Sequence, residues 1–583
     1  MGVSTSSYWY CFYCKTRGLH SGHHVYCPFT KPSDNHLSSE AQAAQQETVG
    51  GSQAATGTQP YRRTRSKNNS LFVDVNPANL DLRTDRGFRE DAWQAFNNPH
   101  LPQPLNGVSR LPIWCELDSI IFPWAFMLDE MHLFWENVLI LLFNHWRGRF
   151  FSRKDSKAKK FIQTNDTYNI KPSLWDQIGD GMQSSAPDFP AAWSDSLRHY
   201  SKHCHEFKAS EWRTFGMLIA PIVLDDEEVL PSECYEAFCD LIEAIESATS
   251  DIPQADINDT IRTPLIDFLH HYEAIYYQHS WDRLETCRSQ IHFLAHVADC
   301  VEWCGPMNLY AQWSCERFCG MIAQSVRNRV QANRATSLNI LRQQQMYHIP
   351  FMARKQHKPL PLLDPLEDTG EESTCLVSLI TNMVDIRIDS SERRSKRSAS
   401  SRVQNAVPLG TLENIFIPPQ GLHGPMKCKI KTHIRSHIFR FLKEWGLNVA
   451  RGSIPQIVTA YRGVEAPDGS HLSSDLLKQS NATRSRLYAE YLWRNSDDKQ
   501  PRTFYGKVLL FLSFRIEESR YPELFLALVQ DFDCENQGRL KRIVRVDRQD
   551  IICASDVLGM VAVIKNGINN RSYIVKQRTA LIG

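Results

Sequence analysis

The chain has 583 residues, of which 42% are apolar and 10% aromatic, so it can bury a large core and wholesale disorder is excluded. Lys and Arg number 66 and Asp and Glu number 65, which neither requires nor excludes a nucleic-acid partner, because a local basic face can bind one. The longest strongly apolar run, VLILLF at 138–143, is much shorter than the ~20 residues that span a bilayer, so we expect no membrane segment.

Residues 1–32 are rich in aromatic residues and cysteine, and the CFYC motif places Cys11 and Cys14 at a zinc-binding spacing. The chain has 16 cysteines and no secretory signal, which indicates reduced thiols or metal ligands rather than disulfides. Residues 33–70 are rich in Ser, Gln, Ala, Gly and Thr, a composition typical of a disordered linker.

The first globular part is expected at 71–150. Its run SIIFPWAFML at 119–128 predicts a buried strand, and residues 129–146 predict a helix with an acidic first turn. Residues 151–345 are expected to be helical, because apolar positions recur at helical spacing from 206 onward.

The second half of the chain changes character. Residues 346–410 predict a second linker, and residues 411–500 a helical or irregular region. Short runs rich in β-branched and aromatic residues, separated by turn residues, predict a small antiparallel β domain at 501–577. The fold class expected from these elements is mixed α/β.

A closed zinc site needs four ligands, and Cys11 and Cys14 supply two of them. His292 and His296 lie four residues apart, so a helix would place them on one face. The alternatives are an ordinary pair of buried thiols and two core histidines with other partners. Ligand candidates nearer to the CFYC motif are His20, His23, His24 and Cys27.

Two acidic positions are candidates for catalysis. Asp129, Glu130 and His132 follow the predicted strand directly, where side chains can point into a cleft and hold a metal or activate water. The alternative for Asp129 is capping of the helix that follows. Glu316 stands beside Arg317 in an apolar segment, and its alternative role is a buried ion pair with that or another cation.

Three basic runs could meet a phosphate backbone, and the alternative for each is a solvated surface. SVRNRVQANR at 325–334 supplies Arg327, Arg329 and Arg334. MKCKIKTHIRSH occupies 426–437, and SERRSKRSASSR at 391–402 also fits a nuclear localisation signal.

Four blocks of the sequence resemble the fungal CACTA-type (En/Spm-like) transposases, relatives of the DDE recombinases. The first is the CFYC region, the second runs from NLDLRTDRGF to DEMHLFWENV, and the third is FKASEWRTFGMLIAPIVL. The fourth, IHFLAHVADCVEWCGPMNLYAQWSCERFCGMIAQSVRNRVQANRATSLNIL, is the most specific. The resemblance covers roughly residues 8–345.

The resemblance implies a ribonuclease H-like catalytic core, partial in this chain, with a large α-helical insertion. Enzymes of this kind hold two Mg²⁺ ions between three carboxylates. Glu316 matches the last of these carboxylates, Arg317 would lie beside the DNA backbone, and Asp129 and His132 match a D-x-x-H signature. The related V(D)J recombinase core shares one zinc ion between a CxxC motif and a later histidine pair, which implies a structural zinc site at Cys11, Cys14, His292 and His296.

The family carries its first catalytic Asp residues before the CxxC motif, whereas Asp74 in SLFVDVN follows it. We therefore expect little or no transposase activity from the polypeptide as written, which looks truncated at its N-terminus. The expected function is DNA cleavage and strand transfer at transposon ends in the nucleus, or a remnant of it. The expected partners are transposon-end and target DNA and a second copy of the chain, with no membrane and no small-molecule substrate. The alternatives are a non-catalytic DNA-binding or chromatin-associated protein and a helical protein-interaction scaffold.

Overall fold

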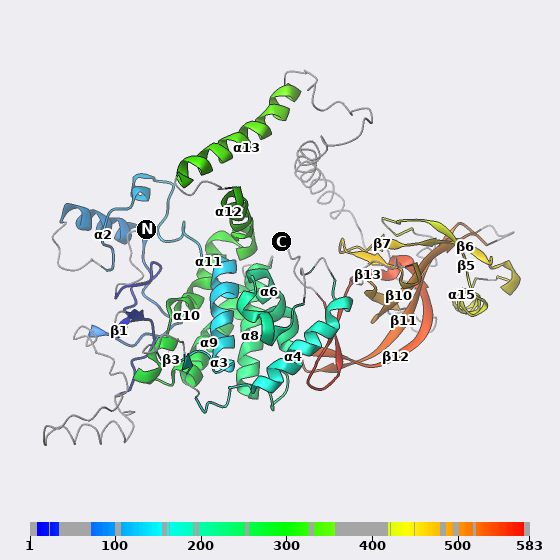
Figure 1. Ribbon diagram of the computed structural model, residues 1–583, viewed down its shortest axis with the longest axis horizontal. Helices are drawn as coiled ribbons and strands as arrows, with labels where there is room; N and C mark the ends of the chain where they lie inside the picture. Colours follow the sequence, from blue (N-terminus) through cyan, green and yellow to red (C-terminus); the bar gives the residue numbers. More distant parts are fainter. Residues whose placement is uncertain are drawn as a thin grey trace. The chain divides into compact units, whose positions relative to one another are not determined.

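A computed structural model describes residues 8–21, 24–33, 71–98, 106–153, 160–161, 164–190, 193, 197–250, 256–325, 331–355, 418–419, 421–447, 449–477, 486–493, 501–516 and 521–576. The chain divides into two compact units. Figure 1 labels their helices and strands along the sequence. The first contains residues 1–312, 415–492 and 503–583, and the second contains 313–414 and 493–502. Both expected linkers lie largely outside the described residues, as does the basic run at 391–402. The fold is mixed helix and antiparallel sheet, as expected.

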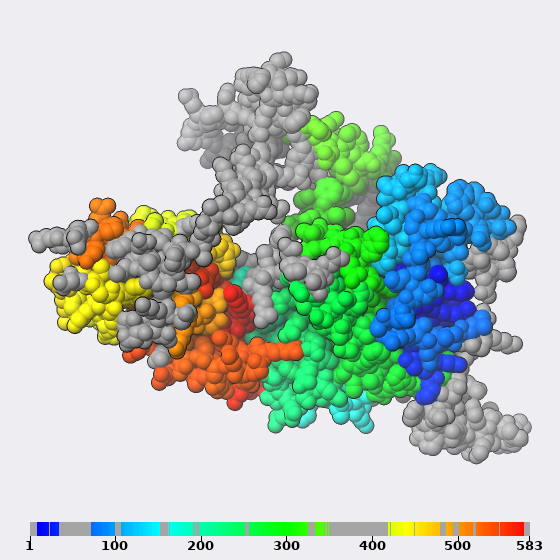
Figure 2. Space-filling model, turned by 180° about the vertical axis from the view of Figure 1, so that it is seen from behind, coloured from blue at the N-terminus to red at the C-terminus, as the bar shows by residue number. Residues whose placement is uncertain are grey.

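The N-terminal segment is a short hairpin of β1 (Leu19–Ser21) and β2 (His24–Tyr26), preceded by the CFYC loop. Further along, α2 (Asp85–Asn97) begins at Thr84, whose side chain accepts a hydrogen bond from the Gly87 N–H. In Figure 2 the dark-blue N-terminal residues lie against the green residues of the helical body. This segment is therefore part of the first unit and packs on residues far away in the sequence.

The strand predicted at 119–128 is wrong. The described residues between 71 and 150 form helices, turns and isolated bridges, and 119–128 is a series of turns around the cis peptide Phe122–Pro123. Pro123 has no N–H to donate to a neighbouring strand, which argues against a central strand. The adjacent Phe122 is buried without a strand, because its ring stacks on Phe88 of α2 at 4.4 Å, whereas Ile121 is exposed.

The helix predicted at 129–146 is confirmed, as η4 (Met131–Val138), which has π-helical hydrogen bonds, followed by α3 (Leu139–Trp146). Nearly every side chain of α3 is buried, because the other helices surround it. Phe143 packs against Trp146, Trp175, Trp212 and Phe215, and burial of such side chains contributes about 1.5–3 kcal/mol each.

The helices around α3 form the body of the first unit. They are α4 (Pro172–Ser185), α5 (Tyr200–His203), α6 (Ala209–Thr214), α7 (Ala220–Val223), α8 (Ser232–Thr249), α9 (Thr263–Tyr272), α10 (Ser289–Phe293) and α11 (Val297–Cys304). Short 3₁₀ and π segments lie between them: η3 (Ile113–Glu116), η5 (Ala186–Asp188), η6 (Cys204–Glu206), η7 (Phe215–Ile219), η9 (Asn258–Arg262), η10 (Glu273–Tyr277), η11 (Trp281–Thr286), η12 (Leu294–His296) and η13 (Met307–Leu309). The two-residue strands β3 (Ser152–Arg153) and β4 (Lys160–Phe161) pair with each other.

The C-terminal β domain is antiparallel, as predicted, but its strands begin before residue 501. The main sheet contains β5 (Met426–Lys429), β6 (Ile457–Tyr461), β9 (Tyr488–Trp493), β10 (Arg502–Phe514), β11 (Leu524–Gln537), β12 (Leu540–Cys553), β13 (Val557–Met560), β14 (Ala562–Lys565) and β15 (Ser572–Val575). Its order is β13-β9-β10-β11-β12-β15-β14, and β6 pairs with both β10 and β5. A separate ladder joins β7 (Gly463–Glu465) to β8 (His471–Ser473).

The region predicted as helical or irregular at 411–500 therefore supplies strands as well as α15 (Thr432–Glu444), η15 (Arg451–Ser453) and η16 (Asp475–Leu477). η17 (Ala554–Asp556) follows β12. The strand pattern of β5 and β6 is hidden in the sequence because each is short and because lysines alternate with the inward-facing residues of β5. The core forms where Ile434, Ile438 and Leu442 of α15 cover one face of the sheet.

The second unit contains α12 (Trp313–Ser325) and α13 (Ala332–Lys355). The domain predicted at 151–345 is therefore divided after Gln312, and the helix that carries Glu316 is not part of the helical body. Within the described residues, no helix is both long enough and apolar enough to cross a membrane.

Candidate metal centre

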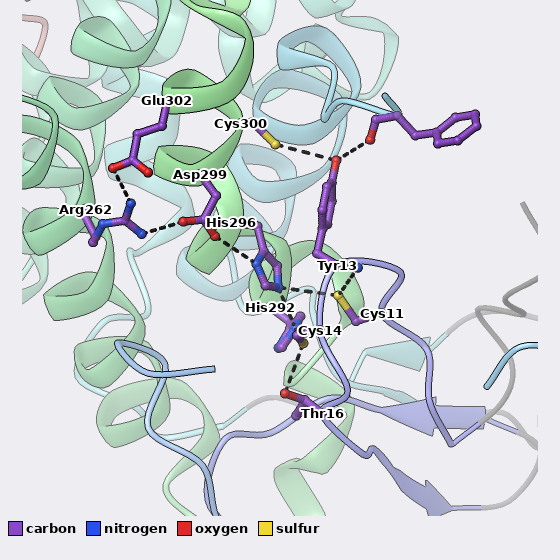
Figure 3. Close-up of polar contacts among 11 residues, drawn as sticks. Cys11, Tyr13, Cys14, Thr16, Arg262, His292, His296, Asp299, Cys300 and Glu302 are labelled. Carbon is purple, nitrogen blue, oxygen red and sulfur yellow. Dashed lines mark hydrogen bonds and ion pairs between the residues drawn. The ribbon is translucent and has the colours of Figure 1, made fainter. Parts of the chain in front are cut away.

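Four side chains from two distant parts of the chain meet at one buried point (Figure 3). Cys11 Sγ lies 3.5 Å from His296 Nε2, and Cys14 Sγ lies 3.3 Å from His292 Nε2. The two Nε2 atoms are 3.4 Å apart, and the four ligand atoms all lie within 4.8 Å of one another. All four residues are completely buried, so the group is a candidate metal centre that the fold closes off from solvent.

The spacing of these atoms fits tetrahedral coordination of one ion. Zn–S bonds of ~2.3 Å and Zn–N bonds of ~2.0–2.1 Å place pairs of tetrahedral ligands roughly 3.3–3.8 Å apart. The three separations above lie within this range. Two thiolates and two imidazoles also form one of the common ligand sets of structural zinc. The residues can therefore hold a metal ion such as zinc.

The CFYC loop is held in place by the buried guanidinium of Arg83. Its Nε donates to the carbonyl oxygens of Cys11 and Cys14, at 3.2 and 3.1 Å, and its Nη2 donates to Asn106 O at 2.6 Å. The backbone of this loop also pairs with the segment before α2, where the Arg83 N–H donates to Tyr13 O at 2.7 Å. A single cation therefore fixes both cysteine backbones, and its charge favours thiolates nearby.

The two histidines lie on either side of a change from an α-helix to a 3₁₀-helix. His292 lies in α10 and His296 in η12, and the spacing of four residues puts both rings on the same side. Tyr10 OH lies 2.9 Å from His292 Nδ1, and Asp299 Oδ2 lies 3.4 Å from His296 Nδ1. Because Nδ1 of each ring has its own partner, each Nε2 is left to point at the ion.

A series of charged side chains supports His296 on the Nδ1 side of its ring. Asp299 Oδ1 accepts from Arg262 Nη1 at 2.7 Å, and Arg262 Nη2 donates to Glu302 at 2.7 Å (Figure 3). On the cysteine side, the Tyr13 N–H donates to Cys11 Sγ at 3.3 Å, and Thr16 Oγ1 lies 3.1 Å from Cys14 Sγ. Such partners orient the ligands and tune their basicity.

The protonation states of the cluster favour one thiolate even before an ion binds. Burial raises the pKa of the Cys11 thiol well above its usual value, and the neighbouring Cys14 adds to the effect. Burial also opposes the Cys14 thiolate, but hydrogen bonds from Cys11 and the imidazoles outweigh it, so the pKa of Cys14 lies well below its usual value. Burial lowers the pKa of His292, whereas Asp299 and Cys14 outweigh burial at His296 and raise its pKa. Metal ligands are thiolates and neutral imidazoles, so binding of a divalent ion would release the remaining protons.

The nearer ligand candidates are not part of this group. His20 lies in β1, His24 is exposed in β2, and His23 lies outside the described residues. Cys27 is buried, but it does not belong to the metal-binding group. The histidine pair at 292 and 296 is therefore the one that the fold brings to the CFYC motif.

Asp129 and His132 lie together, and the helix-capping role of Asp129 is confirmed. Asp129 Oδ2 accepts from the His132 backbone N–H at 2.9 Å and lies 2.7 Å from His132 Nδ1. Its Oδ1 accepts from the Gln312 N–H at 2.6 Å. Both carboxylate oxygens therefore have structural partners, and a catalytic role for Asp129 and His132 stays a prediction.

The alternative role of Glu316, a buried ion pair with Arg317 or another cation, is wrong. Both side chains are exposed on α12, and so are Cys315 and Cys319 on the same helix. The apolar residues around them do not form a core there, because Phe318 and Met321 are themselves 40% and 43% exposed. Arg334 is exposed on α13, and Arg327 and Arg329 lie outside the described residues.

Sequence reasoning missed the residues that support the metal ligands, namely Tyr10, Thr16, Arg83, Arg262 and Asp299. Asp299 carries a readable signal, because it follows His296 by three residues, a spacing that brings side chains together on a helix. Arg83 carries none, since its contacts depend on backbone atoms about 70 positions earlier in the chain. Comparisons with protein-family models, curated proteins and solved structures find no match to this chain.

Proposed function

We propose that this protein is related to CACTA-type transposases and associates with DNA in the nucleus, with a structural zinc ion that fastens its N-terminal segment to the helical body. The observation that carries the proposal is the convergence of CxxC and HxxxH motifs, which are 278 residues apart between Cys14 and His292, on one buried set of ligands. The resemblance of the sequence to this family implies the same four ligands.

Zinc is the ion that this ligand set suits best. Thiolate ligands disfavour Mg²⁺ and Ca²⁺, which prefer oxygen, and a tetrahedral arrangement of two sulfur and two nitrogen atoms is typical of zinc. With four protein ligands the coordination shell is complete, so no position is left for a substrate or a reactive water. The ion would therefore act as a cross-link between the CFYC loop and α10.

Metal analysis of the purified protein tests the zinc site. We expect about one zinc per chain, and we expect the double variant Cys14→Ser, His296→Ala to lose it. The matched control is Cys27→Ser, which removes a buried thiol close to the cluster and should leave the zinc content unchanged. A wild-type protein that is folded and free of metal would refute the proposal.

The catalytic part of the proposal rests on the resemblance. By this resemblance Glu316 would match the last metal-binding carboxylate of such enzymes, and Asp129 and His132 would match their D-x-x-H signature. Enzymes of this kind use Mg²⁺ to activate the attacking hydroxyl and to stabilise the leaving oxygen. The two alternatives are a non-catalytic DNA-binding or chromatin-associated protein and a protein-interaction scaffold. A log K that does not change with log salt, when binding to DNA is measured, would favour the scaffold.

A further inference from the structure

The segment in which β5 leads into α15 is rich in Lys and Arg and contains no acidic residue. The segment from Met426 to Lys443 contains six Lys and Arg residues and no Asp or Glu, in a chain with a formal net charge of only +1. This is part of one of the basic runs noted in the sequence, and the zinc site does not account for it. Its structure shows which of these charges face solvent.

Alternation along β5 separates its apolar and charged residues. Met426 and Cys428 pack against the core of the C-terminal domain and Ile430 is buried within it, whereas Lys427, Lys429 and Lys431 are exposed. Residues two apart in a strand are ~6.6 Å apart along its axis, which sets the spacing of Lys427 and Lys429 in β5. Lys431 continues this row as the extended residue before α15. Because β5 pairs with β6 and is the outermost strand on that side, the row lies at an edge of the sheet.

Two arginines extend this row onto the neighbouring segment. Arg435 of α15 donates from Nη2 to Ile454 O at 2.6 Å, and Arg451 of η15 donates to Ser436 Oγ at 2.5 Å. The same segment continues beside β5, since the Ile430 N–H donates to Gln456 O at 2.9 Å. We refer to Lys427, Lys429, Lys431, Arg435 and Arg451 as the β5–α15 cluster.

The cations of this cluster differ from those of the helical body in their partners. Among the described residues, none of the five has a carboxylate oxygen within 4.0 Å, whereas Arg198, Arg262 and Arg283 each form close ion pairs. Glu444, the last residue of α15, interacts electrostatically with Arg440, and Asp550 interacts with His437, neither of which belongs to the cluster. The cluster therefore presents positive charge that the fold leaves unbalanced.

Edge lysines alone have a simpler explanation, because charge on an outer strand discourages pairing with another sheet. That explanation does not cover Arg435 and Arg451, which are not on the edge strand. We propose that the β5–α15 cluster binds the phosphate backbone of duplex DNA without sequence preference; the choice of DNA as the polyanion rests on the proposed function. Lys and Arg side chains bind phosphates in this way and release counterions, which makes the affinity fall with salt.

The test is the salt dependence of binding to a fluorescent duplex of mixed sequence, measured by anisotropy on the full chain. Five phosphate contacts predict a slope of about −4.5 in log K against log salt, at about −0.9 per contact. We expect the triple variant Lys427→Gln, Lys429→Gln, Lys431→Gln to reduce the size of the slope by about 2.7. The matched control changes three exposed cations outside the cluster, Arg86→Gln in α2, Lys171→Gln and Lys202→Gln.

The single variant Arg451→Gln provides a second measurement if the triple variant aggregates through its exposed edge, and should reduce the slope by about 0.9. Steep binding by the wild type with no change in the β5–α15 variants would overturn this inference and leave the proposed function intact. An equal reduction of the slope in the control variant would attribute the effect to net charge and would also overturn this inference. If the wild type shows no affinity for DNA, this inference and the DNA-binding part of the proposed function both fail, but zinc content still tests the metal site. Equal binding to phosphatidylserine vesicles would contradict the assignment to DNA.

Discussion

Two neighbouring parts of the same sequence block have opposite environments. His292 and His296 are completely buried between the CFYC loop and the helical body, whereas Glu316 and Arg317, only about 20 positions later, are exposed on α12. Both parts contain polar residues among apolar ones. The difference is that the histidines meet ligands and hydrogen-bond partners from distant segments, while α12 belongs to a separate unit. A polar motif is buried only where the fold brings it enough partners to replace water.

Among the experiments that test this difference, removal of the metal should have the largest effect on stability. A structural zinc site contributes roughly 10–16 kcal/mol in small zinc-binding peptides, so we expect chelation to lower the melting temperature by about 10 °C or more. Circular dichroism with a zinc chelator, followed by addition of zinc, measures the loss and its recovery. The double variant Cys14→Ser, His296→Ala serves as control and should not respond to the chelator. If chelation strips the metal and the melting temperature stays the same, the ion is not structural.

Loss of the carboxylate behind His296 should have an intermediate effect. Asp299→Ala removes the partner of His296 Nδ1, and the loss of such a partner typically weakens metal binding 10–100-fold. Competition with a chelator of known affinity measures this change. Glu302→Ala is the matched control, because Glu302 pairs with Arg262 and does not contact the imidazole. Equal losses of affinity in both variants would show that the charge of the region, rather than the contact with His296, matters.

Substitution of Glu316 should give the smallest effect. Glu316→Gln changes an exposed side chain, so we expect the free energy of unfolding to change by no more than about 0.5 kcal/mol. Urea unfolding measures this value. The buried comparison is Glu273→Ala, which removes the carboxylate that accepts from the Phe29 N–H at 2.6 Å and where we expect a loss of about 1–3 kcal/mol. A loss above about 1.5 kcal/mol for Glu316→Gln would mean that α12 buries this carboxylate against another part of the protein.

The metal ligands could be predicted from the sequence because the two members of each pair are close together in the chain. CxxC and HxxxH are each short patterns that restrict the geometry of two side chains, and the family resemblance joined them. The supporting contacts were out of reach, since Arg83 bonds to backbone carbonyls and Tyr10 reaches a ring 282 positions away. Backbone carbonyls carry no residue identity, so no sequence pattern reports such bonds.

The errors in the fold have related causes. The apolar run at 119–128 forms turns around Pro123 and is buried only in part, because an apolar run does not itself specify a strand. The early strands β5 and β6 were missed because short strands give weak patterns and lysines interrupt one of them. The alternative of a buried ion pair for Glu316 is wrong, because a segment with apolar neighbours can still be exposed when its helix forms part of a separate unit.

The long separation between the two halves of the metal centre has a consequence during synthesis. At about 5–20 residues per second, the ribosome needs roughly 15–55 s to add the 278 positions between Cys14 and His292. Throughout that time His292 and His296 have not been made, so the two thiols remain open to oxidation or to other metals. Once the ion binds, it closes a loop for which chain-entropy arguments give a stabilisation of about 5–6 kcal/mol. The N-terminal segment is therefore synthesised before the histidine segment, but it is fixed in place only after the histidines have been made and the ion has bound.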